Sequence, residues 1–168
     1  MPSSRANIAQ AVVDALKQAS GHAYFGALTF DVNRQYLPAR SVEDLAGLTL
    51  TVPPVGPEKR VLFSRADVEK LFSFDIGIQK RVSTECDPAS PAGNAELDPL
   101  LTFAEQVAHF FEPDPKSDAP QTKGFISNTA GEKLAQWVSS EIKPAYDPNH
   151  LLEYRVFTSR IILTVRYF

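Results

Sequence analysis

The chain has 168 residues, which is enough for one domain with a hydrophobic core and too few for two domains of ordinary size. Hydrophobic residues make up 43% of the sequence and exclude a wholly disordered chain, while a formal net charge of −3 excludes a generally basic surface for nucleic acid. The single cysteine, Cys86, excludes an internal disulfide framework or a zinc site of several thiolates, and we expect a reducing compartment. No apolar run approaches the length of about 18 residues that a membrane span needs, and Asp14 and Lys17 interrupt the first apolar stretch. We therefore expect neither a cleaved signal nor a membrane span.

The first third of the chain predicts one helix and two strands. Apolar residues at three- and four-residue spacing indicate an amphipathic helix over 7–19, ended by Gly21. Alternating apolar residues indicate a half-buried strand over 24–37, which Pro38 stops, and a short strand over 48–52. Turn signals accompany these elements: Ser41 with Glu43 and Asp44 as a cap for a short turn of helix, and Pro53 with Pro54 after the short strand.

The clearest alternation of the sequence lies in residues 72–82. Apolar and polar residues take turns there, as in a strand with one buried face and one face toward water. Because one apolar face needs a partner, we expect the other elements to be arranged around this strand. Residues 60–63 predict a short strand before it, and residues 64–67 predict a turn. The predicted buried residues are Phe72, Phe74, Ile76, Ile78 and Val82, and those between are Ser73, Asp75, Gly77, Gln79 and Arg81.

A long acidic loop is predicted over 83–96, because the alternation stops there and the segment contains no cation. A helix follows over 97–111, with Asp98 suited to the N-cap and Pro99 to the first helical position. Its predicted inner stripe is Leu100, Leu101, Ala104, Val107, Ala108 and Phe111, and the acidic residues of the loop are Glu85, Asp87, Glu96 and, at its edge, Asp98.

The last third of the chain predicts two strands after a second long loop over about 112–130. Residues 135–142 favour a strand, although their apolar spacing also fits a helix, so both alternatives stay open. A turn over 144–148 leads to a long final strand from about Tyr154. Three arginines along that strand are candidates either for a phosphate track or for blunting a sheet edge: Arg155, Arg160 and Arg166.

These elements predict an α+β fold. It is a single mixed or antiparallel β-sheet with the N-terminal helix and the second helix, 97–111, packed on it, in one domain over 1–168. The two long loops exceed ordinary connections, so we expect them to carry function or to reach a partner.

Local motifs give no support to an enzyme. His109 has a carboxylate one helical turn away but no further ligand, which favours a solvated helix face over a metal site. Asp147 and His150 flank turn residues, so their spacing indicates a turn before it indicates an acid and base pair. Cys86 lies between two acidic residues, which disfavour the thiolate. Phosphate-binding glycine loops and nucleophile elbows are absent from the sequence. We expect no catalytic residue, cofactor or metal.

Several segments, taken in order, resemble one known protein family. They are the N-terminal helix that leads to Phe25 and on to Tyr36-Leu37-Pro38; Asp44-Leu45 followed by residues 48–53; residues 74–81; Leu97-Asp98-Pro99-Leu100-Leu101 opening a helix; Pro144-Ala145-Tyr146-Asp147; and the alternating residues 157–167. In this pattern the chain resembles the tail terminator, or tail completion, proteins of long-tailed bacteriophages. The likeness spans nearly the whole chain, except residues 113–133, which look like an insertion relative to smaller members.

The resemblance implies a structural virion protein without catalytic residues. Such a subunit forms a hexameric ring that caps the tail tube at its head-proximal end and joins it to the head-side connector. The implied partners are copies of itself, the tail tube protein and the connector or stopper protein, with no membrane, and the implied location is the virion tail after assembly in the host cytoplasm. Genomic DNA would pass through the lumen without specific binding. Candidate subunit or partner contacts are Glu85, Asp87, Glu96, Arg155, Arg160 and Arg166.

Two further expectations accompany this resemblance. If the acidic segment 83–96 faces the lumen of the ring, it repels passing DNA. The alternatives within the same class are a head-completion adaptor (stopper) or a tail tube subunit, and the enzyme alternative is a small hydrolase that uses His109 or His150 with nearby carboxylates.

Overall fold

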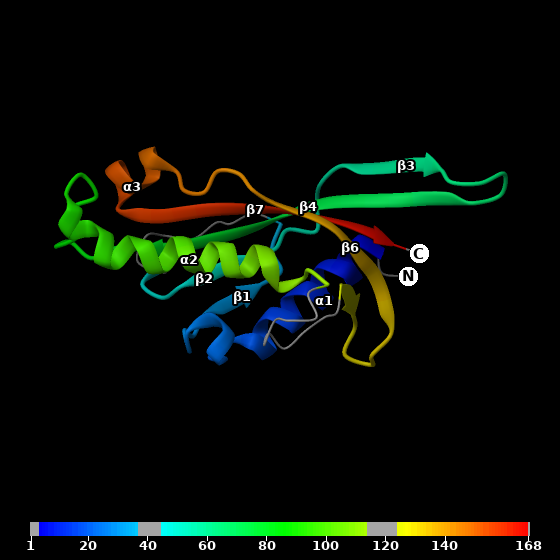
Figure 1. Ribbon diagram of the computed structural model, residues 1–168, viewed down its shortest axis with the longest axis horizontal. Helices are drawn as coiled ribbons and strands as arrows, with labels where there is room; N and C mark the ends of the chain where they lie inside the picture. The colour runs from blue at the N-terminus through cyan, green and yellow to red at the C-terminus, as the bar shows by residue number, and fades with distance from the viewer. Residues whose placement is uncertain (1–3, 37–44, 114–123, 168) are drawn as a thin grey trace.

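The computed structural model describes residues 4–36, 45–113 and 124–167. These residues contain three α-helices and a seven-stranded sheet (Figure 1). The helices are α1 (Ser4–Ala19), α2 (Asn94–Phe110) and α3 (Pro148–Tyr154). The strands are β1 (Asp31–Asn33), β2 (Thr49–Thr51), β3 (Glu58–Leu62), β4 (Val68–Arg81), β5 (Phe125–Ser127), β6 (Lys133–Ile142) and β7 (Val156–Tyr167).

Strands β4 and β7 form the centre of the sheet. They pair antiparallel from Lys70 opposite Tyr167 to Arg81 opposite Val156. The strand order is β1-β2-β4-β7-β6-β5, and β3 pairs with the part of β4 that β2 leaves free. Only β1 and β2 run parallel among the pairs of described strands. The predicted α+β class with a mixed sheet is therefore confirmed.

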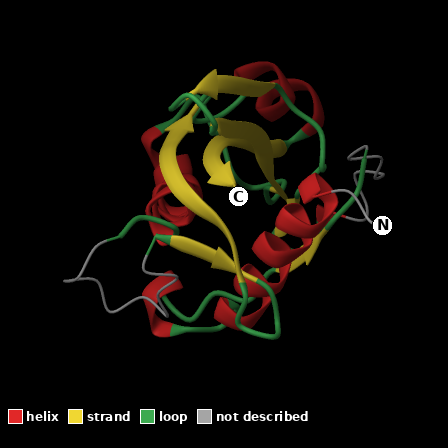
Figure 2. Cartoon of the chain, turned by 90° about the vertical axis from the view of Figure 1, so that its right-hand side faces the viewer, coloured by secondary structure: helices red, strands yellow, loops and turns green. Residues whose placement is uncertain are grey.

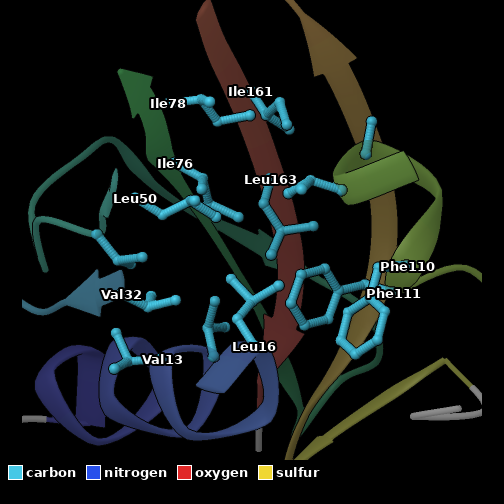
Figure 3. Packing of buried hydrophobic residues seen from close by; sticks show 14 of the residues in the cluster. Val13, Leu16, Val32, Leu50, Ile76, Ile78, Phe110, Phe111, Ile161 and Leu163 are labelled. Atoms are coloured by element: carbon cyan, nitrogen blue, oxygen red, sulfur yellow. The ribbon is translucent and has the colours of Figure 1, made fainter. Parts of the chain in front are cut away.

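Helices α1 and α2 cover one face of the sheet, which we call the inner face. α1 contacts β1 and β5, the strands at the two ends of the sheet, so the sheet curls around this helix (Figure 2). α2 lies against β7 and β6. The side chains that meet between helices and sheet include Val13, Leu16, Leu50, Ile76, Phe110, Phe111 and Leu163 (Figure 3).

The alternation predicted for β4 is confirmed. Phe72, Phe74, Ile76 and Ile78 are at most 1% exposed on the inner face, and each contributes about 1.5–3 kcal/mol by burial. The residues between them are half-buried rather than fully exposed, because the side chains of adjacent strands on the outer face cover one another. The Ser73 hydroxyl, for example, lies 2.8 Å from the Thr164 hydroxyl of β7.

The first part of β4 extends past β7 and pairs only with β3. We call residues 61–69 the hairpin arm; it projects at one end of the molecule (Figure 1). The predicted turn over 64–67 is confirmed, since the backbone N–H of Phe63 donates to the Asp67 carbonyl at 2.9 Å. Just before β3, the chain passes so close to β4 that a Cβ on Gly56 would lie 1.8 Å from the Ser73 carbonyl oxygen. Only glycine fits there.

The predicted start of the second helix is wrong. α2 begins at Asn94, preceded by a 3-10 turn over Pro91–Gly93 that the Ser90 side chain caps. Asp98 therefore caps nothing, and Pro99 lies within the helix, where its missing N–H removes one intrahelical hydrogen bond. The segment Asn94–Glu96, assigned to the acidic loop from sequence, is helical.

Helix α3 was not predicted. Its N-cap is Asp147, whose side chain accepts hydrogen bonds from the backbone N–H groups of Asn149 and His150, with Pro148 at the first helical position. The helix ends at Arg155, which has a left-handed backbone with φ of 55°. As a result, the final strand begins at Val156 and not at Tyr154.

The predicted strand over 24–37 is largely wrong. Only Asp31–Asn33 pairs in the sheet, and Ala23–Phe25 forms a 3-10 turn. The chain before β1 folds back locally, since the backbone N–H of Gly21 donates to the Leu28 carbonyl at 2.8 Å. Leu37, the predicted turn at Ser41 and most of the second long loop lie outside the described residues. The predicted strand over 135–142 is confirmed as β6, whereas β5 was not predicted.

Candidate assembly surfaces

The histidines considered from sequence lie apart and bond locally. His109 is exposed on α2, with Nδ1 at 2.9 Å from the Glu112 carboxylate. His150 Nδ1 lies 3.1 Å from the Thr158 hydroxyl, and its Nε2 lies 3.8 Å from Asp147 Oδ2, while Asp147 Oδ1 caps α3. Within residues 4–36, 45–113 and 124–167, no three His, Cys, Asp or Glu side chains are grouped to hold a metal ion. No helix in these ranges combines the length and the apolar character needed to cross a membrane.

Cys86 is a buried structural residue. It is 5% exposed, and its thiol lies 3.9 Å from the Gly93 carbonyl oxygen. Burial raises the pKa of the Cys86 thiol, and the nearby Glu96 carboxylate adds to this effect. The sequence suggested that the adjacent Glu85 and Asp87 disfavour the thiolate, but burial is the larger cause.

The three candidate arginines do not form one track. Arg160 and Arg166 share the outer face of β7, where Arg160 Nε donates to the Lys143 carbonyl at 2.7 Å and Arg166 pairs with Glu69. Arg155 lies before the strand and donates to the Cys86 carbonyl oxygen, which links α3 to the acidic loop. Each of these guanidinium groups thus connects two parts of this fold.

The three candidate acidic residues divide into two kinds. Glu85 and Asp87 are exposed. Glu96 instead accepts hydrogen bonds from the backbone N–H of Ser83 at 2.7 Å and from its hydroxyl at 2.8 Å. Partial burial raises the pKa of Glu96, but the hydrogen bonds from Ser83 outweigh it and the net shift is downward. Glu96 therefore stays charged and closes the loop, while the other two face solvent.

The hairpin arm carries large apolar side chains that face solvent. Leu62 is 74% exposed, Phe63 is 75% exposed and Val68 is 51% exposed. Leu62 and Val68 are cross-strand partners that continue the inner-face positions of the sheet. They are exposed because the arm extends beyond α1 and α2 (Figure 1). Clustered exposed apolar residues of this kind mark contact sites.

An ionic network holds the base of the arm. Arg5 of α1 and Arg60 of β3 each contact the Glu58 carboxylate at 2.7 Å, and the Glu58 side chain is only 10% exposed. Hydrogen bonds from Arg60, then Arg5, then Tyr167 hold the pKa of Glu58 at about 2. The direction of the arm is thereby tied to the helix beneath the sheet.

The start of α2, helix α3 and the start of β7 meet at the end of the molecule opposite the arm (Figure 1). An open apolar pocket is lined by residues of these elements. Its volume is about 350 Å³. Asp98 is the one charged side chain among the described residues that line it. Leu152, at 68% exposed, and Tyr146, at 43% exposed, lie at its rim. The apolar lining comes mainly from Leu97, Leu101, Tyr146, Leu151, Leu152 and Phe157.

The chain matches no protein-family model, and no curated protein matches it at a significant level.

Sequence reasoning missed both the apolar arm tip and the pocket. The signal for the tip was present, because the apolar residues Leu62 and Phe63 run directly into the turn over 64–67 without alternation. The pocket depends on α3, whose N-cap and first-position proline, Asp147 and Pro148, were interpreted as a turn.

Proposed function

We propose that this chain is a tail terminator (tail completion) subunit of a long-tailed bacteriophage. In this role it forms a hexameric ring that caps the tail tube and joins it to the head-side connector. The observation that carries the proposal is the hairpin arm, which presents Leu62, Phe63 and Val68 to solvent at one end of the molecule. Exposed apolar side chains on a projecting element are what a subunit needs to bind a neighbour.

Two further observations support an assembly role over a catalytic one. His150 lies near both the Thr158 hydroxyl and Asp147, but its Nε2 is 3.8 Å from Asp147 Oδ2, which exceeds a hydrogen bond, and Asp147 Oδ1 is engaged as the cap of α3. Two charged pairs on the outer face of the sheet lie within the fold, Arg160 with Asp75 and Arg166 with Glu69.

The partners in this proposal are further copies of the chain, the tail tube protein and the connector or stopper protein. Genomic DNA passes through the ring without specific contacts, and the exposed loop acids Glu85 and Asp87 favour its passage by repulsion. The mature location is the head-proximal end of the virion tail, reached after assembly in the host cytoplasm.

The decisive experiment is deletion of the gene in the phage that encodes it, followed by electron microscopy of the particles. We expect tails longer than wild-type that fail to join heads. Tails of normal length that fail to join heads would instead identify a head-completion adaptor, and the absence of tails would identify a tube subunit. Normal infectious particles would overturn the proposal.

A further inference from the structure

The hairpin arm lies at one end of the long axis of the molecule, and the start of α2 with helix α3 lies at the other (Figure 1). Residues of these two helices line the apolar pocket. We propose that the tip of the arm of one copy, led by Phe63, docks into the pocket at the start of α2 and α3 of a second copy. This inference rests on the proposed function in that it names the contact by which ring subunits join.

The two surfaces match in apolar character. The arm presents Leu62 and Phe63, both about three-quarters exposed, and the pocket is lined mainly by leucine and aromatic side chains. An aromatic anchor that enters a preformed apolar pocket is a typical centre of a protein interface. Neither surface is covered by another described part of this chain, so a second copy satisfies both.

One charged pair accompanies the apolar match. Arg65 lies exposed at the turn of the arm, beside the apolar tip, whereas the two acids of the arm have partners within the fold, Asp67 in the Ser64 hydroxyl and Glu69 in Arg166. The pocket has Asp98 in its lining, and residues 83–98 next to it contain four acidic residues and no cation. A contact of Arg65 with Asp98 is favoured, whereas two pockets that face each other are not.

The proposed ring requires one kind of contact. A knob and its hole at opposite ends of one chain can join copies head to tail, or reciprocally across a two-fold axis. Head-to-tail contacts generate closed rings when the rotation between neighbours closes. The ring of the proposed function requires the head-to-tail form, so this is the form of the contact that we propose.

Disulfide trapping on the full chain tests this contact. The double variant Ala66→Cys with Leu152→Cys places one thiol on the turn of the arm and one on the pocket rim, both at exposed positions, and keeps Phe63 in place. Under mild oxidation at high protein concentration we expect a ladder of covalent oligomers beyond the dimer. Each single variant should give dimers at most, and the buried native thiol Cys86 sets the background in the parent protein.

Charge reversal in the double-cysteine background tests specificity. Arg65→Glu should lower the ladder yield by about tenfold, and adding Asp98→Arg should restore it. Lys17→Glu, an exposed reversal on α1, is the matched control and should leave the yield unchanged. Circular dichroism verifies that each variant is folded.

Three results would overturn the docking contact: no species beyond the dimer, a cyclised monomer, or a ladder that Arg65→Glu leaves unchanged. A failure of the docking contact can be distinguished from a failure of the proposed function. Trapping without any tail defect on gene deletion would retain the contact and remove the tail role. Overlong tails on deletion, with no ladder from the purified protein, would retain the tail role and remove the contact.

Discussion

Arg5 in α1 and Glu58 in β3 are joined by two hydrogen bonds, from Nε at 3.0 Å and from Nη2 at 2.7 Å, to one oxygen of the carboxylate. Arg60 Nε donates to the other oxygen at 2.7 Å. The start of the first helix is thus fixed to the base of the hairpin arm, although the two lie far apart in sequence. The orientation of the arm depends on a charged contact, while its tip depends on apolar ones.

The first prediction concerns the pH dependence of Glu58→Gln. The pKa of Glu58 falls from its ordinary value of 4.5 to about 2 in the folded protein, first because of Arg60 and then Arg5. A lowered carboxyl pKa stabilises the fold above the unfolded value, and this stabilisation is lost as the pH falls toward the folded value. The wild type should therefore exceed Glu58→Gln in free energy of unfolding at pH 7, and the difference should shrink between pH 4.5 and 2.

Urea denaturation at a series of pH values measures this difference. Glu105→Gln, an exposed change on α2, is the control and should follow the wild type. A gap between wild type and Glu58→Gln that stays constant down to pH 2 would contradict the assigned role.

The second prediction compares two neighbouring positions on α2. Phe103 is 0% exposed and its ring centroid lies 5.4 Å from that of Phe25 and 5.1 Å from that of Phe30. Phe103→Ala should cost about 3–5 kcal/mol of unfolding free energy because it leaves a cavity in the core. Leu101 is only half-buried at the pocket, so Leu101→Ala should cost less than about 2 kcal/mol. Equal losses in chemical denaturation would mean that the pocket wall is as tightly packed as the core.

The third prediction uses two of the four Asp-Pro pairs of the sequence. Asp147→Ala removes the N-cap of α3 and should cost about 1 kcal/mol, whereas Asp147→Asn should retain most of the stability. Asp98→Ala changes an exposed residue inside α2 and should stay within about 0.5 kcal/mol of the wild type. Thermal and urea unfolding of the three variants measure these values; a larger loss at Asp98 than at Asp147 would reverse the assignment of the cap.

The fourth prediction concerns DNA passage under the proposed function. Replacing the exposed Glu85 and Asp87 by Lys should slow DNA ejection from purified particles while tails still join heads. Glu96 is excluded from this variant because its hydrogen bonds to Ser83 hold the loop. Glu105→Lys, on the exposed side of α2, is the control. Unchanged ejection kinetics would show that the loop acids do not act on passing DNA.

The strands of the sheet were predictable where the apolar and polar alternation in the sequence matches the burial of the side chains in the fold. Residues 72–82 and 157–167 alternate strongly, and they form the two central strands, because each inner-face side chain has its partner across β4 and β7. The short strand near Leu50 was predictable for the same reason. Its Thr49 and Thr51, which lie between the apolar positions, are only 3% and 4% exposed, since outer-face packing is set by neighbours that are distant in sequence.

Helix starts were not predictable from the local Asp-Pro signal alone. The same Asp-Pro signal begins α3 at Pro148 but lies inside α2 at Pro99. At Pro99 the helix has already started, because the 3-10 turn over Pro91–Gly93 leads directly into it. Gly93 fits against the Asp87 carbonyl, where a Cβ would approach to 2.2 Å, and this tertiary contact leaves no mark in the local pattern.

The candidate surfaces were the least predictable part. Glu85, Asp87 and Glu96 look alike in sequence, yet Glu96 closes the loop on Ser83 while the other two face solvent. The exposure of Phe63 follows from the length by which β4 exceeds β7, and such a difference between strand ends cannot be read from either strand alone.

Because the arm is a ribbon of two strands beyond the reach of the helices, its amides have little to protect them from water in an isolated chain. Deuterium should enter residues 61–69 long before it enters the central ladder between β4 and β7. A neighbouring subunit that binds the arm should slow this uptake, so the deuterium uptake of the arm amides measures binding.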